Sequence, residues 1–101
     1  MNAVFVSNDQ MALGVLHYAN LHHIQIPKDL AVIGFDGLSE AAFYTPSLTT
    51  IVHPLRELGI LAVKTLLYQI DAGYTGLADY SPAKSLVLST QLLVRDSTPA
   101  A

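Results

Sequence analysis

Three short apolar runs along the chain each end in polar residues that can form hydrogen bonds. Their bounds are residues 3–7 (AVFVS), 30–35 (LAVIGF) and 49–52 (TTIV). Such runs, bounded by turn-forming residues, are typical of strands buried on both faces of a sheet. The residues that follow them are Asn8 and Asp9, Asp36, and His53. The pattern therefore predicts three buried strands that each deliver polar side chains at their ends.

A helix is predicted between the first two strands, from Asp9 to about His22. Apolar residues recur there at spacings of three and four, which gives an inner face of Met11, Ala12, Val15, Leu16 and Ala19. Pro27 prevents the helix from continuing, and Pro27 to Asp29 form a turn before the next strand.

A longer helix is predicted from Pro54 to about Ala72, with Gly73 just past its end. Its one clear polar stripe consists of Glu57, Lys64, Tyr68 and Asp71, and apolar residues occupy most of the remaining circumference. We expect this helix to be covered on more than one side.

The remaining segments read as loops and a final strand. Residues 37–50 contain one predicted helical turn capped by Ser39, and residues 74–84 are predicted to be a loop. Ser85 to Arg95 reads as one strand, or as two strands with an irregularity near Ser89 and Thr90.

Alternating strands and helices predict an α/β fold with a mainly parallel sheet flanked by helices. The carboxyl ends of its strands would share one edge, where ligands bind in sheets of this type. Asn8, Asp36 and His53 are the candidate ligand-binding residues, because each lies where a strand ends. Two readings stay open, since Asn8 and Asp9 also suit a helix start and a lone histidine is often structural.

Composition indicates that part of the surface faces more protein. The 101 residues are 51% hydrophobic and only 13% charged, against a usual charged share of about 25%. The net charge is −3, and the five basic residues do not form the cluster that binding to a nucleic-acid backbone needs. The absence of cysteine excludes disulfides and fits a reducing compartment. With no leader and no membrane-length apolar run, we expect a soluble, cytoplasmic protein.

We expect neither catalytic nor metal-binding chemistry, and we expect no cofactor. The sequence has neither a nucleophile elbow nor a phosphate-binding loop. His17 and His22 are five residues apart, which is not the spacing that aligns two imidazoles on a helix, and the adjacent His23 does not change this. We therefore predict a protein that is not an enzyme.

Four motifs in this order resemble the LacI/GalR family of bacterial transcription regulators. They are "SNDQMALGVL", "IPKDLAVIGFDG", "YTPSLTTI" and "LLVRDST", and the resemblance spans residues 3–98. Members combine a helix-turn-helix headpiece with a two-lobed sensor that folds like a type I periplasmic binding protein. The resemblance implies that residues 1–101 are a C-terminal fragment of that sensor, without the DNA-binding headpiece.

Within that sensor, the resemblance assigns about residues 3–52 to the second lobe. Residues 53–88 would return to the first lobe, and residues 89–98 would cross back to the second. Asn8 and Asp36 match positions that hydrogen-bond the effector, usually a sugar, and His53 matches a crossover position that often lines the cleft. Phe43, Tyr44 and the outer face of the first helix match the region where family members form homodimers, and Asp9 is expected to cap that helix.

Two residues depart from the family pattern. Gly37 stands where many members have a second acid, and His23 stands near the glycine that usually ends the first helix. Histidine tolerates a left-handed backbone better than most residues, so the second change is compatible with the fold.

Three functions are weighed on this basis. The first is effector sensing, with DNA bound only through the missing headpiece. The alternatives are a fragment of a sugar-binding transport protein and a short module that pairs with intact repressors.

Overall fold

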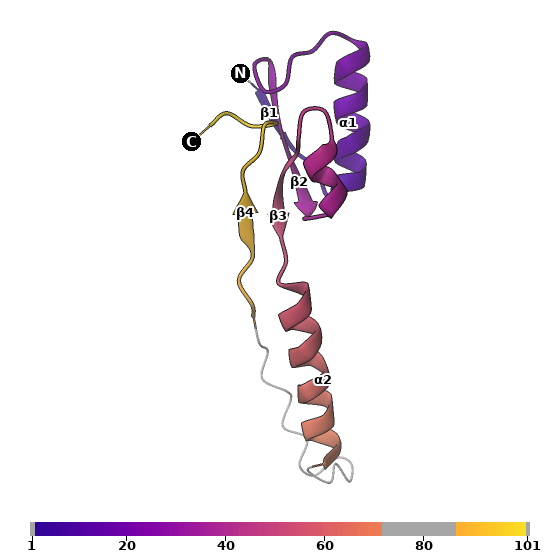
Figure 1. Cartoon of the computed structure of the whole chain (residues 1–101), viewed down its shortest axis with the longest axis vertical. Helices are drawn as coiled ribbons and strands as arrows, with labels where there is room; N and C mark the ends of the chain where they lie inside the picture. Colours follow the sequence, from indigo (N-terminus) through magenta and orange to yellow (C-terminus); the bar gives the residue numbers. More distant parts are fainter. Residues whose placement is uncertain (1, 72–86, 101) are drawn as a thin grey trace. The chain divides into compact units, whose positions relative to one another are not determined.

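The computed structural model describes residues 2–71 and 87–100 (Figure 1). Its elements are β1 (Asn2–Phe5), α1 (Asp9–Leu21), β2 (Leu30–Asp36), the 3-10 helix η1 (Ser39–Phe43), β3 (Thr49–Val52), α2 (Leu55–Asp71) and β4 (Gln91–Leu93). The predicted order of strands and helices is confirmed. The predicted loop at 74–84 lies outside the described residues.

The described strands form one sheet in the order β1-β2-β3-β4. Strands β1, β2 and β3 are parallel, with Val4 opposite Val32 and Ile33 opposite Thr49. Strand β4 is antiparallel to β3. The α/β fold with a mainly parallel sheet is therefore confirmed.

The last strand is shorter than the sequence indicated. Residues 87–90 and 94–95 are not in a strand, and β4 keeps only Gln91–Leu93. Its partner β3 is four residues long, and only three of those residues, Thr50 to Val52, pair with β4. The prediction of a strand from Ser85 to Arg95 is therefore wrong for residues 87–90 and 94–95, and residues 85–86 lie outside the described part of the chain.

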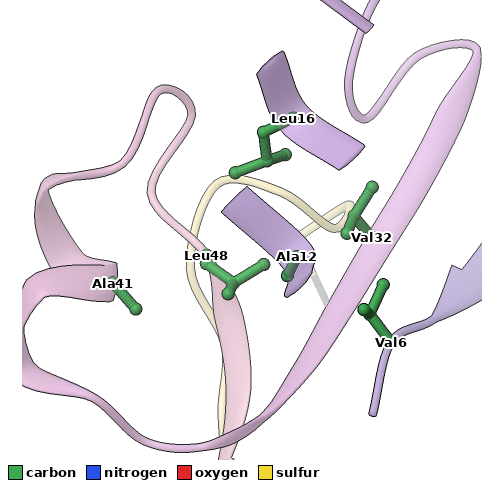
Figure 2. Packing of buried hydrophobic residues seen from close by; sticks show 6 residues of the cluster. All are labelled: Val6, Ala12, Leu16, Val32, Ala41 and Leu48. Carbon is green, nitrogen blue, oxygen red and sulfur yellow. The ribbon is translucent and has the colours of Figure 1, made fainter. Parts of the chain in front are cut away.

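The core lies between α1 and the sheet. Figure 2 shows its central cluster, which consists of Val6, Ala12, Leu16, Val32, Ala41 and Leu48. Of the predicted inner face of α1, Ala12, Leu16 and Ala19 are buried and Val15 is half-buried. Met11 is 56% exposed, so its assignment to the inner face is wrong. It faces an apolar groove beside α1 that Gly14, Tyr18 and Leu30 also line.

Helix α1 ends on a histidine in a left-handed conformation, as the sequence suggested. His23 has φ 58°, and the Ile24 amide donates to the Ala19 carbonyl at 2.9 Å. This bond closes the last turn of the helix in the way that a terminal glycine usually permits.

The motif near the C-terminus fastens β2 to β3. The fully buried Ser97 hydroxyl donates to the Val32 carbonyl at 2.6 Å and accepts from the Thr49 amide at 2.8 Å. Arg95 adds a bond from its guanidinium to the Leu48 carbonyl at 3.0 Å. These contacts give a structural reason for the paired motifs "TPSLTT" and "VRDST".

The chain divides into two compact units, Met1–His53 with Thr90–Ala101, and Pro54–Ser89. The described part of the second unit contains α2, which has no buried residue. Its exposed apolar side chains include Leu55, Leu58, Val63 and Leu66. Neither α2 nor any other helix within the described residues has the length and hydropathy needed to cross a membrane. The assignment of the units to two lobes of a sensor stays a prediction.

Candidate functional site

Two of the three predicted site residues meet at the carboxyl edge of the sheet. Strands β2 and β3 run parallel with Asp36 opposite Val52, so the next residue, His53, lies beside Asp36. The His53 Nε2 atom is 3.3 Å from the Asp36 Oδ1 atom. Their side chains are 26% and 45% exposed, respectively, so the pair is accessible to a ligand.

An aromatic row supports this pair. The Phe35 ring packs edge-on against the His53 imidazole, with 4.6 Å between centroids and 82° between planes. Phe5 packs against Phe35 in turn, at 6.3 Å. The sequence alone does not predict this contact, because alternation along a strand says nothing about its neighbours across the sheet.

The backbone at Asp36 has an unusual conformation. Asp36 has φ 118° and Gly37 has φ 73°. A non-glycine residue in this region persists only where its surroundings fix it, and such residues cluster at functional sites. A Cβ atom at residue 37 would lie 3.1 Å from the Val52 Cα atom, and this close approach and the positive φ both favour a glycine there.

The third predicted site residue, Asn8, is the N-cap of α1. Its Oδ1 atom accepts a hydrogen bond from the Met11 amide at 2.8 Å. The expectation that Asp9 caps the helix is therefore wrong. Both residues are good caps by type, and the choice between them is made by packing against the sheet.

Asp9 instead points inward and is fully buried. Its Oδ2 atom accepts from the Leu38 amide at 2.8 Å, and its Oδ1 atom accepts from the Thr50 hydroxyl at 2.7 Å. The Thr50 oxygen also accepts from the Gly37 amide at 3.2 Å. Gly34 makes this possible, since a Cβ atom there would overlap the Asp9 carboxylate. A glycine inside a predicted strand is the one signal in the sequence for this close approach.

The residues predicted for the dimer interface have different environments. Phe43 is 86% exposed, whereas Tyr44 is half-buried against the core cluster. Burial raises the pKa of the Tyr44 phenol above its ordinary value, and the negative charges of Asp9 and Glu40 raise it further.

Other candidate sites are few among the described residues. No group of three or more histidine and acidic side chains in residues 2–71 and 87–100 is arranged to hold a metal ion. A groove of about 510 Å³ lies at the far end of α1, where Asn20, His23 and Lys28 contribute to its lining. None of the predicted ligand-binding residues borders it.

Comparison with known proteins supplies the family. Residues 2–98 match the model of the periplasmic binding protein-like domain. The ribose operon repressor of Escherichia coli K12 is 48% identical over 68 residues, which are 67% of this chain and 21% of that protein. The transcriptional repressor CytR of the same organism is 38% identical over 98 residues, which are 97% of this chain and 27% of that protein.

A solved structure agrees with these relatives. The lac repressor dimer bound to operator and the anti-inducer ONPF matches with a TM-score of 0.81 at 33% identity, over 97% of this chain and 32% of that chain. The chain thus spans about a fifth to a third of the length of these proteins, which are transcriptional regulators and not enzymes. It belongs to the periplasmic binding protein-like domain family, in the form that LacI/GalR-type transcriptional regulators carry.

Proposed function

We propose that this chain is the effector-sensing part of a LacI-type transcriptional regulator, and that it binds a sugar at the carboxyl edge of the sheet. The observation that carries the proposal is the Asp36–His53 pair, held half-exposed at the ends of two parallel strands. A carboxylate accepts hydrogen bonds from neighbouring sugar hydroxyls, and an imidazole can donate or accept. Asp36 uses Oδ1 toward His53, which leaves Oδ2 for a hydroxyl.

Asn8 adds a donor to this set. Its carbonyl oxygen is used by the cap, so its amide N–H groups are what it offers to a ligand. A site built to pair with hydroxyls also rejects analogues that lack them, because buried polar groups would be left unpaired. The name of the ribose operon repressor supports a pentose as the first probe.

Control of DNA binding would follow from linkage. An effector that binds one arrangement of the sensor more tightly shifts the population toward it, and a dimer passes that shift to its DNA-binding domains. We place the dimer contact at Phe43, Tyr44 and the outer face of α1. Phe43 is 86% exposed, so its ring is available to pack against a partner. DNA would be bound only through a helix-turn-helix domain outside this chain.

A titration of the chain with D-ribose, followed by amide NMR, tests the binding site. We expect saturable shifts at residues 8, 36–38 and 53, which Asp36→Asn and Asn8→Asp abolish. Asp29→Asn is the matched control, since Asp29 also accepts a backbone amide, from Gln25 at 2.9 Å, but in an exposed turn away from this edge. The absence of shifts with D-ribose and with a panel of pentoses, hexoses and disaccharides would contradict the proposal.

The regulatory part has its own test. An antibody raised against "KSLVLSTQLLVRDST" would report the intact mass of the native protein. We expect a mass of about three times the 10.9 kDa of this chain, because the lac repressor match covers about a third of that protein. We also expect the native protein to co-purify with operator DNA. A native mass of 10.9 kDa would overturn this part and favour the module that pairs with intact repressors.

A further inference from the structure

We propose that Asp9 is a positioning residue that holds the turn of residues 36–38 and thereby sets where the Asp36 carboxylate lies. This inference rests on the proposed function for its meaning in ligand binding, but its structural part stands alone. Asp9 contacts no residue of the Asp36–His53 pair directly, so it acts through the backbone that follows Asp36.

Three bonds carry the positioning. The Asp9 carboxylate holds the Leu38 amide at 2.8 Å with one oxygen and the Thr50 hydroxyl at 2.7 Å with the other. The Thr50 oxygen then holds the Gly37 amide at 3.2 Å. The two amides that follow Asp36 are therefore fixed, directly and through one hydroxyl, by a single carboxylate.

The turn needs such an anchor because its backbone is not one that aspartate adopts unaided. Asp36 has φ 118°, a conformation that requires support from the surroundings. The carboxylate supplies it from a fully buried position, where hydrogen bonds to a charged group are strong and water does not compete. Gly34 leaves the space through which the carboxylate reaches the turn.

The consequence is a link between the first residue of α1 and the ligand-facing residue of β2. If α1 shifts along the sheet, Asp9 moves with it, and the turn that carries Asp36 loses its anchor. The position of α1 and the geometry of the Asp36–His53 pair are thereby coupled within one lobe.

The three-bond HN–Hα coupling of Asp36 tests the proposal in the full chain, because it distinguishes a positive φ from an extended backbone. We expect Asp9→Asn and Thr50→Val to raise this coupling toward the extended value. We also expect Asp9→Asn to speed amide exchange at Leu38, and Thr50→Val to speed it at Gly37, each by about tenfold, the loss of one net hydrogen bond. Thr50→Ser keeps the hydroxyl and should restore both values.

Two controls separate positioning from general destabilisation. Asp29→Asn makes the same chemical change at an exposed turn, and Ser97→Ala weakens the sheet without touching residues 36–38; both should leave the Asp36 coupling unchanged. If Asp9→Asn does not fold, Thr50→Val decides, since valine has the shape of threonine. An unchanged coupling in folded Thr50→Val would overturn the proposal.

A sugar titration of the same variants separates this inference from the proposed function. If the wild-type chain binds D-ribose, Thr50→Val should weaken binding by about tenfold and Thr50→Ser should not. A changed Asp36 coupling in a chain that binds no sugar would overturn the proposed function and leave the positioning intact. Tight binding by a variant whose coupling has changed would overturn the link between the turn and the ligand.

Discussion

Replacing Ser97 by alanine tests how the end of the chain secures the sheet. The substitution removes the hydroxyl that accepts from the Thr49 amide and donates to the Val32 carbonyl. Both partners belong to fully buried residues, so neither group regains a bond from bulk water. A buried polar group without a partner costs about 1 to 3 kcal/mol, so two groups predict a loss of about 2 to 6 kcal/mol in the free energy of unfolding.

Urea denaturation followed through the amide signals of β2 measures this loss in the unit that contains Ser97. The matched control is Ser39→Ala, at an exposed serine whose side chain caps nothing, and it should change stability by less than about 0.5 kcal/mol. If Ser97→Ala is as stable as Ser39→Ala, the buried network does not hold the sheet together and the reasoning is wrong.

Three further predictions concern single positions. Gly34→Ala should cost about 3 kcal/mol or prevent folding, because the new methyl group overlaps the Asp9 carboxylate, whereas Gly14→Ala, with open space around it, should gain about 0.5 to 1 kcal/mol in urea melts. Asn8→Ala should lose about 1 kcal/mol with the cap to Met11, and Asn8→Asp should lose almost none; equal losses in thermal melts would show that the cap is not what matters. The raised pKa of Tyr44 means that the folded state holds the phenol proton more tightly than the unfolded state. The contribution of Tyr44 to the free energy of unfolding should therefore be fully present below about pH 10 and fall above it. Unfolding measured on both sides of that pH should show the fall in the wild type and less of it in Tyr44→Phe.

The strands were predictable because each is a short apolar run that ends in turn-forming residues. Residues 30–35 and 49–52 were located within one residue of β2 and β3, since each is an uninterrupted run bounded by turn-forming residues. The predicted last strand was too long, because its length depends on its partner. The apolar residues Val87 and Leu88 do not show that β3 ends at Val52.

The location of the site was predictable from the sequence, but its hydrogen-bond network was not. Parallel strands put Asp36 and His53 on one edge, and the register of β2 and β3 then brings them together. The exchange of roles between Asn8 and Asp9 was not predictable from local preference, because both residue types suit a helix start. What decides it is Gly34, a residue in the next strand, which leaves room for one carboxylate.

The pairing of Val52 with Gln91 has a consequence for how the chain is organised. The residues that flank the intervening segment, residues 54–89, thus lie on neighbouring antiparallel strands. That segment is therefore an insertion into a unit that closes without it, and loop length changes closure entropy only slowly. Replacing residues 53–90 with a two-residue Asn-Gly turn would join β3 to β4 as an ordinary hairpin. The first unit would then be a self-contained miniature of the sheet, with Ser97 still in its place.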